Sequence, residues 1–359
     1  MTFLICLIGT LCLVPILRRL AIETNFVDIP DDRKHHDGLI PPIGGIAIFI
    51  PFLVLSGVYA FQADLHLQDI WPFFTAVIML LLLGVVDDKY HINANFKFLV
   101  HFLAAILVVY NGANLSSMGN LFGYGESDFG WFAPIFSVFC VVYLINAINM
   151  IDGIDGLSCG LGVIMTGYLI LACMLIGVIP PAGLYMLAGG LLGYLWYNMR
   201  TPFRSSAIVF LGDAGSMVLG LILAWYAMTL SQNPANIFEP ITVAWVLALP
   251  IWDAFGMLTA RIRQGRRPFT PDRNHFHHHF LEAGFTQGQA TPLIMGYSAI
   301  LGAIGVFLPK AGFPYWMLTY MWIFMWLVHA QLSHKPAKFI AFLRRIRVRV
   351  WQTKHAANL

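Results

Sequence analysis

Charge is scarce in this sequence. Charged residues make up 11% of its 359 residues and hydrophobic residues 58%, and the mean hydropathy is +0.73. A soluble protein of this length carries more charge, so the composition excludes an ordinary soluble domain. The formal net charge is only +3. We expect membrane lipid, and no nucleic acid, among the partners of this chain.

Cysteine is also too sparse to stabilise a fold by disulfide bonds. The five cysteines all lie in apolar segments, which excludes a disulfide framework and gives no spacing typical of a metal site. Arg18 and Arg19 follow the first apolar run and no basic residue precedes it, so no cleaved signal peptide is expected. No soluble domain or internal repeat is visible. We expect 1–359 to form one transmembrane domain, with a basic cytoplasmic tail over 333–359.

Long apolar runs are what the sequence has in abundance. Many approach or reach the about 17 to 25 residues that cross a bilayer. Such segments cross lipid as helices, because a helix satisfies its own backbone hydrogen bonds. The sequence therefore predicts an all-α, polytopic membrane protein with about eleven transmembrane helices. The predicted spans are 3–17, 43–62, 71–86, 96–112, 131–150, 158–178, 183–199, 207–230, 239–260, 291–308 and 314–332.

The basic residues segregate in this predicted topology. When the spans alternate in direction, every Lys and Arg except Lys310 falls on one face. The positive-inside rule assigns that face to the cytoplasm, which predicts an external N-terminus and a cytoplasmic C-terminus. The tail sequence FLRRIRVRVWQTK is expected to be a solvated end that touches anionic lipid, and a partner-binding role stays open.

Four polar stretches gather on the same predicted face. They read VVDDKYHIN, LINAINMIDGIDGL, VFLGDAGS and RIRQGRRPFTPDRNHFHHHF. Adjacent acids such as Asp87 and Asp88 either mark a solvated helix end or favour a cation or a shared proton, because like charges repel. Asp213 precedes an apolar helix, where an aspartate is a preferred N-cap, and a metal-binding role is compatible with that cap.

The second stretch spaces its polar residues by three. Asn146, Asn149, Asp152 and Asp155 therefore begin on neighbouring positions of a helix surface. The asparagines could serve as contacts between helices in lipid, but that reading does not explain the aspartates. Glycine-rich loops such as the one that follows can point N–H groups at an anion. We expect a polar strip that runs from the end of a span into a binding site.

The fourth stretch combines arginines with histidines. Consecutive His277, His278 and His279 favour a loop that contacts phosphate or sugar over a zinc site, since zinc usually draws ligands from separated positions. Arginine side chains suit phosphates. Asp253 is expected to pair with a neighbouring helix or with Arg261. Hard carboxylates together with substrate phosphates suit Mg²⁺, with Mn²⁺ as an alternative, so these stretches predict a metal–phosphate site at the membrane edge.

In this order, the four stretches resemble the polyprenyl-phosphate N-acetylhexosamine-1-phosphate transferase superfamily. The similarity runs from VDIPDDRKHHDGLIPPIGG to PDRNHFHHHFLEAGFT, and the latter is most similar to the bacterial branch that uses undecaprenyl phosphate and UDP-GlcNAc. The resemblance implies transfer of GlcNAc-1-phosphate at the cytoplasmic face of the inner membrane, as the first step of O-antigen or common-antigen synthesis. It leaves a homodimer open. The chain departs from the branch in reading DDKYH where DDxxD is usual, with His91 in the third acidic position.

The resemblance also implies roles for individual residues. Asp87, Asp88 and Asp213 would be catalytic, with Asp213 and Asn149 binding Mg²⁺ and Lys97 holding the lipid phosphate. Asp28 matches an acid linked to activity. The residues implied for nucleotide and sugar are Asn146, Asp152, Asp155, Phe210 (which would stack on uracil), Arg261, His275, His277 and His278.

Two alternatives remain open. The same chemistry could use another UDP-sugar, such as UDP-MurNAc-pentapeptide. An ion-coupled transporter also places acids in membrane helices, but its substrate site lies near the bilayer midplane, often between inverted repeats. Here the acids gather at one predicted edge and no repeat is visible, which favours the transferase.

Overall fold

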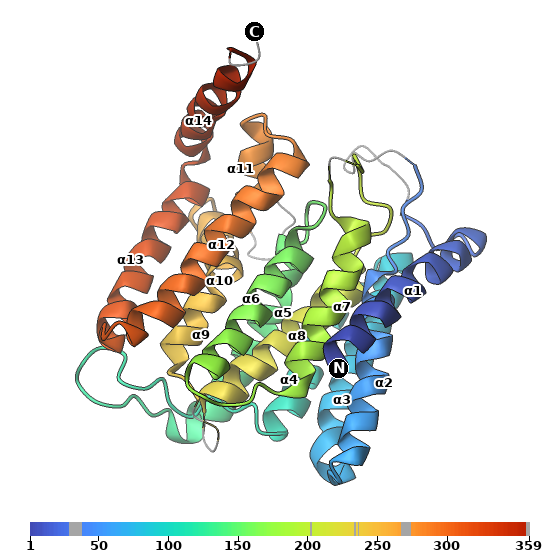
Figure 1. Ribbon diagram of the computed structural model, residues 1–359. Helices are drawn as coiled ribbons and strands as arrows, with labels where there is room; N and C mark the ends of the chain where they lie inside the picture. Colours follow the sequence, from blue (N-terminus) through green and yellow to red (C-terminus); the bar gives the residue numbers. More distant parts are fainter. Residues whose placement is uncertain (29–37, 202, 233–234, 236, 267–273, 357–359) are drawn as a thin grey trace.

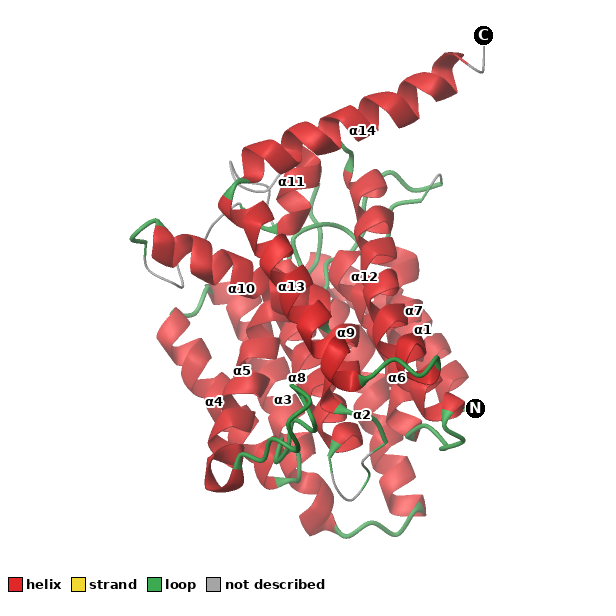
Figure 2. Ribbon diagram, turned by 90° about the vertical axis from the view of Figure 1, so that its left-hand side faces the viewer, coloured by secondary structure: helices red, strands yellow, loops and turns green. Residues whose placement is uncertain are grey.

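The computed structural model describes residues 1–28, 38–201, 203–232, 235, 237–266 and 274–356, the last eight of these by their backbone alone. Within these ranges all regular elements are helices, and extended pairing is limited to three isolated bridges (Figures 1 and 2). The elements are α1 (Thr2–Glu23), α2 (Gly44–Gln62), α3 (Leu67–Tyr90), α4 (Ala94–Tyr110), η1 (Gly130–Phe132), α5 (Ala133–Ile151), α6 (Leu157–Leu175), α7 (Ala182–Asn198), α8 (Gly212–Ser231), α9 (Pro240–Val246), α10 (Ala248–Arg263), α11 (Phe276–Glu282), α12 (Gln287–Lys310), α13 (Tyr315–His334) and α14 (Pro336–Ala356).

The predicted all-helical, polytopic class is confirmed. Every predicted apolar run overlaps a helix over most of its length, with the ninth run divided between α9 and α10, and the run 207–230 begins five residues before α8. In the described part of the chain, seven helices are long and apolar enough to cross a membrane. The count rises to eight if α9 and α10, which meet at a bend of 77°, form one span. Eleven crossings and their orientation stay predictions.

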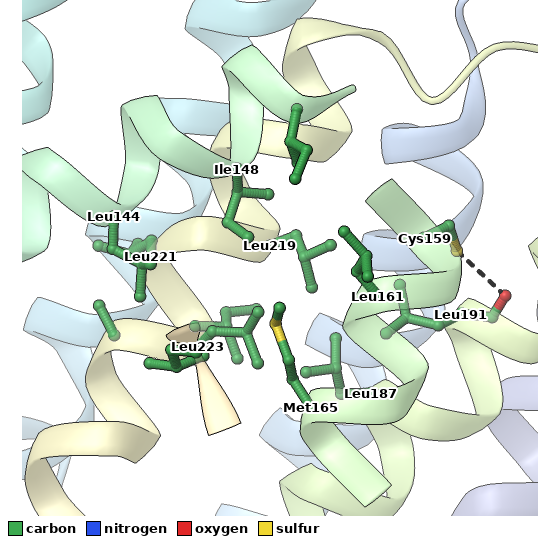
Figure 3. Packing of buried hydrophobic residues seen from close by; sticks show 14 of the residues in the cluster. Leu144, Ile148, Cys159, Leu161, Met165, Leu187, Leu191, Leu219, Leu221 and Leu223 are labelled. Atoms are coloured by element: carbon green, nitrogen blue, oxygen red, sulfur yellow. Dashed lines mark hydrogen bonds between the residues drawn. The ribbon is translucent and has the colours of Figure 1, made fainter. Parts of the chain in front are cut away.

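Helix α8 forms the centre of the bundle. In its apolar stretch 89% of residues are buried, against 17% for α1 at the edge. Figure 3 shows Leu219, Leu221 and Leu223 of α8 among leucine, isoleucine and methionine side chains of α5, α6 and α7. Because α8 is surrounded, the residues at its N-terminus are fixed by several neighbouring helices at once.

Glycines let two helices approach the start of α8 at backbone distance. A Cβ atom on Gly84 of α3 would overlap the backbone of Ala214, and one on Gly45 of α2 would overlap the backbone of Gly215. These close contacts set the height of α8 relative to α2 and α3. They therefore also set the position of Asp213, which lies in the first turn of α8.

The two ends of the bundle differ. In Figure 1, α11 and α14 lie at the upper end, and the connection between α4 and α5 loops across the lower end. Figure 2 shows α14 crossing obliquely above α11. The basic tail is thus a helix in the described range to Ala356, and its packing against α11 begins with Phe339. Its predicted contact with anionic lipid stays a prediction.

Candidate active site

One lysine joins two carboxylates at the start of α8. Lys97 Nζ, from the first turn of α4, donates to Asp87 Oδ2 at 2.6 Å and to Asp213 Oδ2 at 2.9 Å. Asp87 lies near the end of α3, is 6% exposed, and also accepts from the backbone N–H of Ile92 at 2.7 Å. Three residues separated by up to 126 positions thus converge, as their predicted roles require.

The neighbouring acid, Asp88 of α3, binds the backbone N–H groups at the N-terminus of α8. Its Oδ1 accepts from the N–H of Asp213 at 2.9 Å, and its Oδ2 from the N–H of Ala214 at 3.4 Å. A carboxylate at this helix end is favoured by the helix dipole. Gly212 permits the approach, since its φ is +74° and a Cβ there would lie 2.5 Å from Asp88 Oδ2. The N-cap alternative for Asp213 is wrong, because Leu211 is the N-cap residue and Asp88 satisfies these N–H groups.

The two asparagines of α5 have different surroundings. Asn149 Nδ2 donates to Asp213 Oδ1 and to Ser216 Oγ, both at 2.9 Å, and so belongs to the carboxylate cluster. Asn146 Nδ2 donates to the carbonyl of Val142 at 2.7 Å and lies 3.2 Å from His101 Nδ1 on α4. Asn146 therefore matches the alternative of a contact between helices, whereas Asn149 faces Asp213.

Asp155 anchors the loop that joins α5 and α6. Its Oδ2 accepts from Arg200 Nε at 2.6 Å and from the N–H of Ala207 at 3.1 Å. Next to it, the Asn198 side chain accepts from Gly156 N–H at 2.7 Å and donates to the Val209 carbonyl at 2.9 Å. Both side chains tie the loop 152–156 to the segment before α8. The structure thus gives Asp155 a positioning contact, and its predicted place in a nucleotide pocket stays a prediction.

The histidine stretch forms α11 and packs onto this same loop. A Cβ on Gly153 would overlap Nε2 of His277, which is 1% exposed. The rings of His275 and His277 stack at 5.8 Å between centroids, and those of His277 and His278 lie 4.2 Å apart. His275 Nδ1 lies 2.9 Å from Asp253 Oδ2. The expected pairing of Asp253 with a neighbouring helix or Arg261 thus becomes a contact with the residue preceding α11.

The remaining predicted residues lie around these groups. Phe210 is two residues before α8, where its N–H donates to the carbonyl of Pro41 and its carbonyl accepts from Gly44 N–H, each at 2.9 Å. Asp28 pairs by its backbone with Ile40, which precedes that contact. Arg261 is in the last turn of α10 and 5% exposed. Arg267 and Arg273, from the arginine-rich stretch, lie outside the described residues.

Burial and neighbouring charges alter the protonation of the loop and of α11. Withdrawal from water raises the pKa of Asp152 to about 8, and the nearby carboxylates of Asp213, Asp88 and Asp155 act in the same direction. Burial, followed by the neighbouring histidines, lowers the pKa of His277 well below its ordinary value. The loop thus carries less negative charge, and α11 less positive charge, than their residue types suggest.

The donor set of the carboxylate cluster suits a cation. The Lys97 ammonium lies between the carboxylates of Asp87 and Asp213, which shows that positive charge is accommodated there. Among the residues described, no three His, Cys, Asp or Glu side chains form a group that could hold a metal. Magnesium typically uses one or two carboxylates and completes its shell with phosphates and water. Asp213 is one such carboxylate, but its oxygens accept from Asn149 Nδ2 and Lys97 Nζ here, so a bound Mg²⁺ would replace these contacts, and the predicted metal site stays a prediction.

Several residues of the site escaped the sequence analysis. Arg200 was counted only as a basic loop residue, although it holds Asp155, and Ser216 was passed over although it accepts from Asn149. Asn198 showed the same signal as Asn146, a lone amide in an apolar run. Their partners lie far away in the chain, so local sequence patterns could not reveal the pairs.

Comparison with known proteins adds a further line of evidence on the family of this chain. A family model described as glycosyl transferase family 4 matches residues 70–231, which include Asp87, Lys97, Asn149 and Asp213. The undecaprenyl-phosphate alpha-N-acetylglucosaminyl 1-phosphate transferase of Salmonella typhi is 30% identical over 346 residues, covering 95% of this chain and 93% of that protein. Proteins of the same name from Yersinia pestis and Haemophilus influenzae are 32% and 34% identical, covering 93% and 83% of this chain and 91% and 84% of their own.

The fold and the carboxylate cluster define a polytopic membrane protein with a polar, cation-accommodating site at the end of its central helix. Together with relatives that match nearly its whole length, they identify the class as a membrane sugar-1-phosphate transferase. The chain belongs to glycosyl transferase family 4, within the polyprenyl-phosphate N-acetylhexosamine-1-phosphate transferases that its motifs resemble.

Proposed function

We propose that this protein transfers GlcNAc-1-phosphate from UDP-GlcNAc to undecaprenyl phosphate, releasing UMP. The observation that carries the proposal is the junction of Lys97, Asp87 and Asp213 at the N-terminus of α8, next to Asn149. This junction combines a phosphate-binding cation with carboxylates suited to a metal. The names of the relatives, which specify undecaprenyl phosphate and N-acetylglucosaminyl 1-phosphate, supply the acceptor and the transferred group.

The chemistry is one displacement at the β-phosphorus of the donor. An oxygen of the lipid phosphate forms a bond to that phosphorus, and the bond from phosphorus to the bridging oxygen breaks, so that UMP leaves with that oxygen. A phosphate monoester loses its second proton at about pH 6, so the acceptor, undecaprenyl phosphate, is already nucleophilic at neutral pH. The task of the protein is therefore to bring two anions together and align them.

We assign the side chains the roles that the family resemblance implies, and their positions are compatible with these roles. Lys97 neutralises the lipid phosphate. Asp213 and Asn149 would hold Mg²⁺, which supplies positive charge to the pyrophosphate when bound. The loop 152–156, Phe210 and Arg261, with the histidines of α11, orient the UDP-GlcNAc. Asp28 lies on a segment joined by Ile40 and Pro41 to the Phe210 backbone.

Direct attack is favoured over a two-step route through an aspartyl intermediate. A nucleophilic aspartate must direct a lone pair of one carboxylate oxygen at the phosphorus. Both oxygens of Asp88 accept backbone N–H groups of α8, and both oxygens of Asp87 accept hydrogen bonds from Lys97 or Ile92. These hydrogen bonds hold both carboxylates in place and stabilise their negative charge, which lowers their nucleophilicity and supports direct attack.

We propose further that the helices cross the bacterial inner membrane eleven times. In addition to the seven strongest spans, the bent pair α9–α10 would cross as one span, and α4, α7 and α13 would also cross. The segregation of basic residues supports an external N-terminus and a site on the cytoplasmic face. The product would begin O-antigen or common-antigen glycans.

The deciding experiment uses purified protein with undecaprenyl phosphate, Mg²⁺ and a panel of labelled UDP-sugars. We expect label from UDP-GlcNAc to enter an organic-extractable lipid with release of one UMP, and no transfer from UDP-MurNAc-pentapeptide. Label that accumulates inside vesicles without a lipid product would instead indicate a transporter. A burst of UMP equal to the enzyme present, without lipid and with label on Asp87 or Asp88, would establish the two-step route.

A further inference from the structure

Helix α11 is too short to be stable without external support. It has seven residues, and its N-cap residue, His275, makes no capping hydrogen bond with its side chain. Isolated helices shorter than about 12 residues are marginal in water. Yet α11 carries His277 and His278, which we place against the donor. The first turn of α11 must therefore be held by another part of the molecule.

Asp253 of α10 supplies that support. It is 1% exposed, and its two oxygens have two different partners. Oδ1 accepts from the backbone N–H of Phe276 at 2.9 Å, and Oδ2 lies 2.9 Å from Nδ1 of His275. Since a carboxylate can only accept, this contact places a proton on Nδ1 and leaves Nε2 as the ring nitrogen available to another partner.

Buried and partly buried rings cover this junction on the far side. The Phe276 ring lies 4.8 Å from the ring of His329 on α13 and 5.7 Å from that of Phe339 on α14. His329 is 1% exposed. With so little solvent access, water cannot readily replace a lost carboxylate, so both N–H groups depend on Asp253.

On its other side, α11 touches the loop between α5 and α6. His277 lies against Gly153, as described above. Asp253 thus fixes the first turn of α11, and the same turn contacts, through His277, the loop that carries Asp152. A shift at the first turn of α11 would move His275, His277 and His278 together relative to that loop.

We propose that Asp253 is a positioning residue for the sugar-nucleotide side of the reaction, acting through His275 and the first turn of α11. The proposal rests on the proposed function only in naming UDP-GlcNAc as the ligand that α11 faces. It assigns Asp253 no contact with the lipid phosphate, because Lys97 and Asp87 belong to α4 and α3.

The variant Asp253→Asn tests this role with little change in volume. Asparagine offers one acceptor oxygen where two N–H donors need one each. We expect kcat/KM for UDP-GlcNAc to fall by about 100-fold, the loss expected when a reacting group is misplaced by about 1 Å. The KM for undecaprenyl phosphate should stay within about twofold, as for an independent site.

Trp252→Phe is the matched control. It truncates the buried neighbour of Asp253 on α10 without removing either hydrogen bond to α11. We expect it to lower the melting temperature and to leave the KM for UDP-GlcNAc unchanged. An equal rise of both KM values in Asp253→Asn, or the same rise in Trp252→Phe, would reduce Asp253 to a general packing role and overturn the proposal.

A double-mutant cycle with His275→Gln separates action through His275 from independent effects. If Asp253 acts through His275 and the turn that follows it, the double variant should lose far less than the product of the two single losses. Losses that multiply would contradict the proposal.

Hydrogen exchange of the wild-type protein and of Asp253→Asn needs no turnover. It therefore tests the positioning role of Asp253 separately from the proposed transferase function. We expect faster exchange over 276–282 in the variant, and no change over α4 or α8. If the wild-type protein does not transfer from UDP-GlcNAc but exchange over 276–282 is still faster in Asp253→Asn, the proposed function is wrong and the positioning role stands. Unchanged exchange over 276–282 would reject the positioning role.

Discussion

The two halves of the candidate site are built differently. The carboxylate half takes Asp87 and Asp213 from two long helices, α3 and α8, that meet at backbone distance, and Lys97 from α4. The histidine half consists of a five-residue loop and a seven-residue helix, each held by side chains from elsewhere: Arg200 and Asn198 hold the loop, and Asp253 holds the helix. The first half resembles a rigid frame and the second an attached part. We therefore expect substitutions in the carboxylate half to lower activity mainly by changing its charge. Substitutions in the histidine half should lower activity mainly by displacing the residues that bind the donor.

The largest effect is expected at Asp213. Asp213→Ala removes the central acceptor of the carboxylate half, so turnover should fall by more than about 100-fold, since even outer partners of metal ligands are worth about 10–100-fold. Mg²⁺-dependent binding of UDP-GlcNAc, measured calorimetrically, should weaken as well. Asp69→Ala, which removes an exposed acid at the start of α3, serves as the control. Wild-type Mg²⁺ dependence in Asp213→Ala would contradict the assignment.

Lys97→Met should have the next largest effect. The substitution keeps the length of the side chain but removes the charge shared by two carboxylates. We expect the KM for undecaprenyl phosphate to rise by about tenfold, the factor that corresponds to 1.4 kcal/mol. The KM for UDP-GlcNAc should change less. Lys89→Met, at an exposed lysine of the same region, should change neither. If only the donor KM rises, the lysine belongs to the other half of the site.

Gly84→Ala tests whether the frame is rigid. A methyl group there would overlap the backbone of Ala214, so α3 and α8 must separate. Overpacking of this kind costs about 1–3 kcal/mol, and we expect a lower melting temperature together with reduced turnover. Gly57→Ala on α2 is the matched control, because a Cβ at Gly57 meets no atom within 4 Å. Equal stability of the two variants would show that the frame yields.

The smallest effect is expected from Arg200→Gln. Arg200 donates to Asp155 from a partly exposed position, and Asp155 keeps its hydrogen bond from Ala207 N–H. A hydrogen bond to a charged group contributes about 1.5–3 kcal/mol, and solvent around Arg200 reduces that contribution. We expect a severalfold loss confined to kcat/KM for UDP-GlcNAc in steady-state assays. A change in the KM for undecaprenyl phosphate would show that the two halves are coupled.

The same division explains how far the sequence could lead. Apolar run length located the helices, because a bilayer demands a minimum length and internally satisfied backbone groups. Residue type and order pointed to Asp87, Asn149 and Asp213, which the fold brings to one helix end. The contact of Asp88 with α8 and that of Asp253 with α11 escaped detection. Each joins residues far apart in sequence, and only the packing of the helices determines which acid meets which N–H.

The shared lysine also has a kinetic consequence if the proposed reaction holds. Lys97 divides its charge between Asp87 and Asp213, so each carboxylate is neutralised at the expense of the other. An arriving lipid phosphate competes for the same ammonium and, in binding it, loosens the hold on Asp213. Binding of the lipid phosphate would then free the Asp213 carboxylate, which we propose as a ligand of the metal that binds the donor. Binding of one substrate would thereby prepare the site for the other, and initial-rate kinetics with both concentrations varied would show positive interdependence of the two apparent affinities.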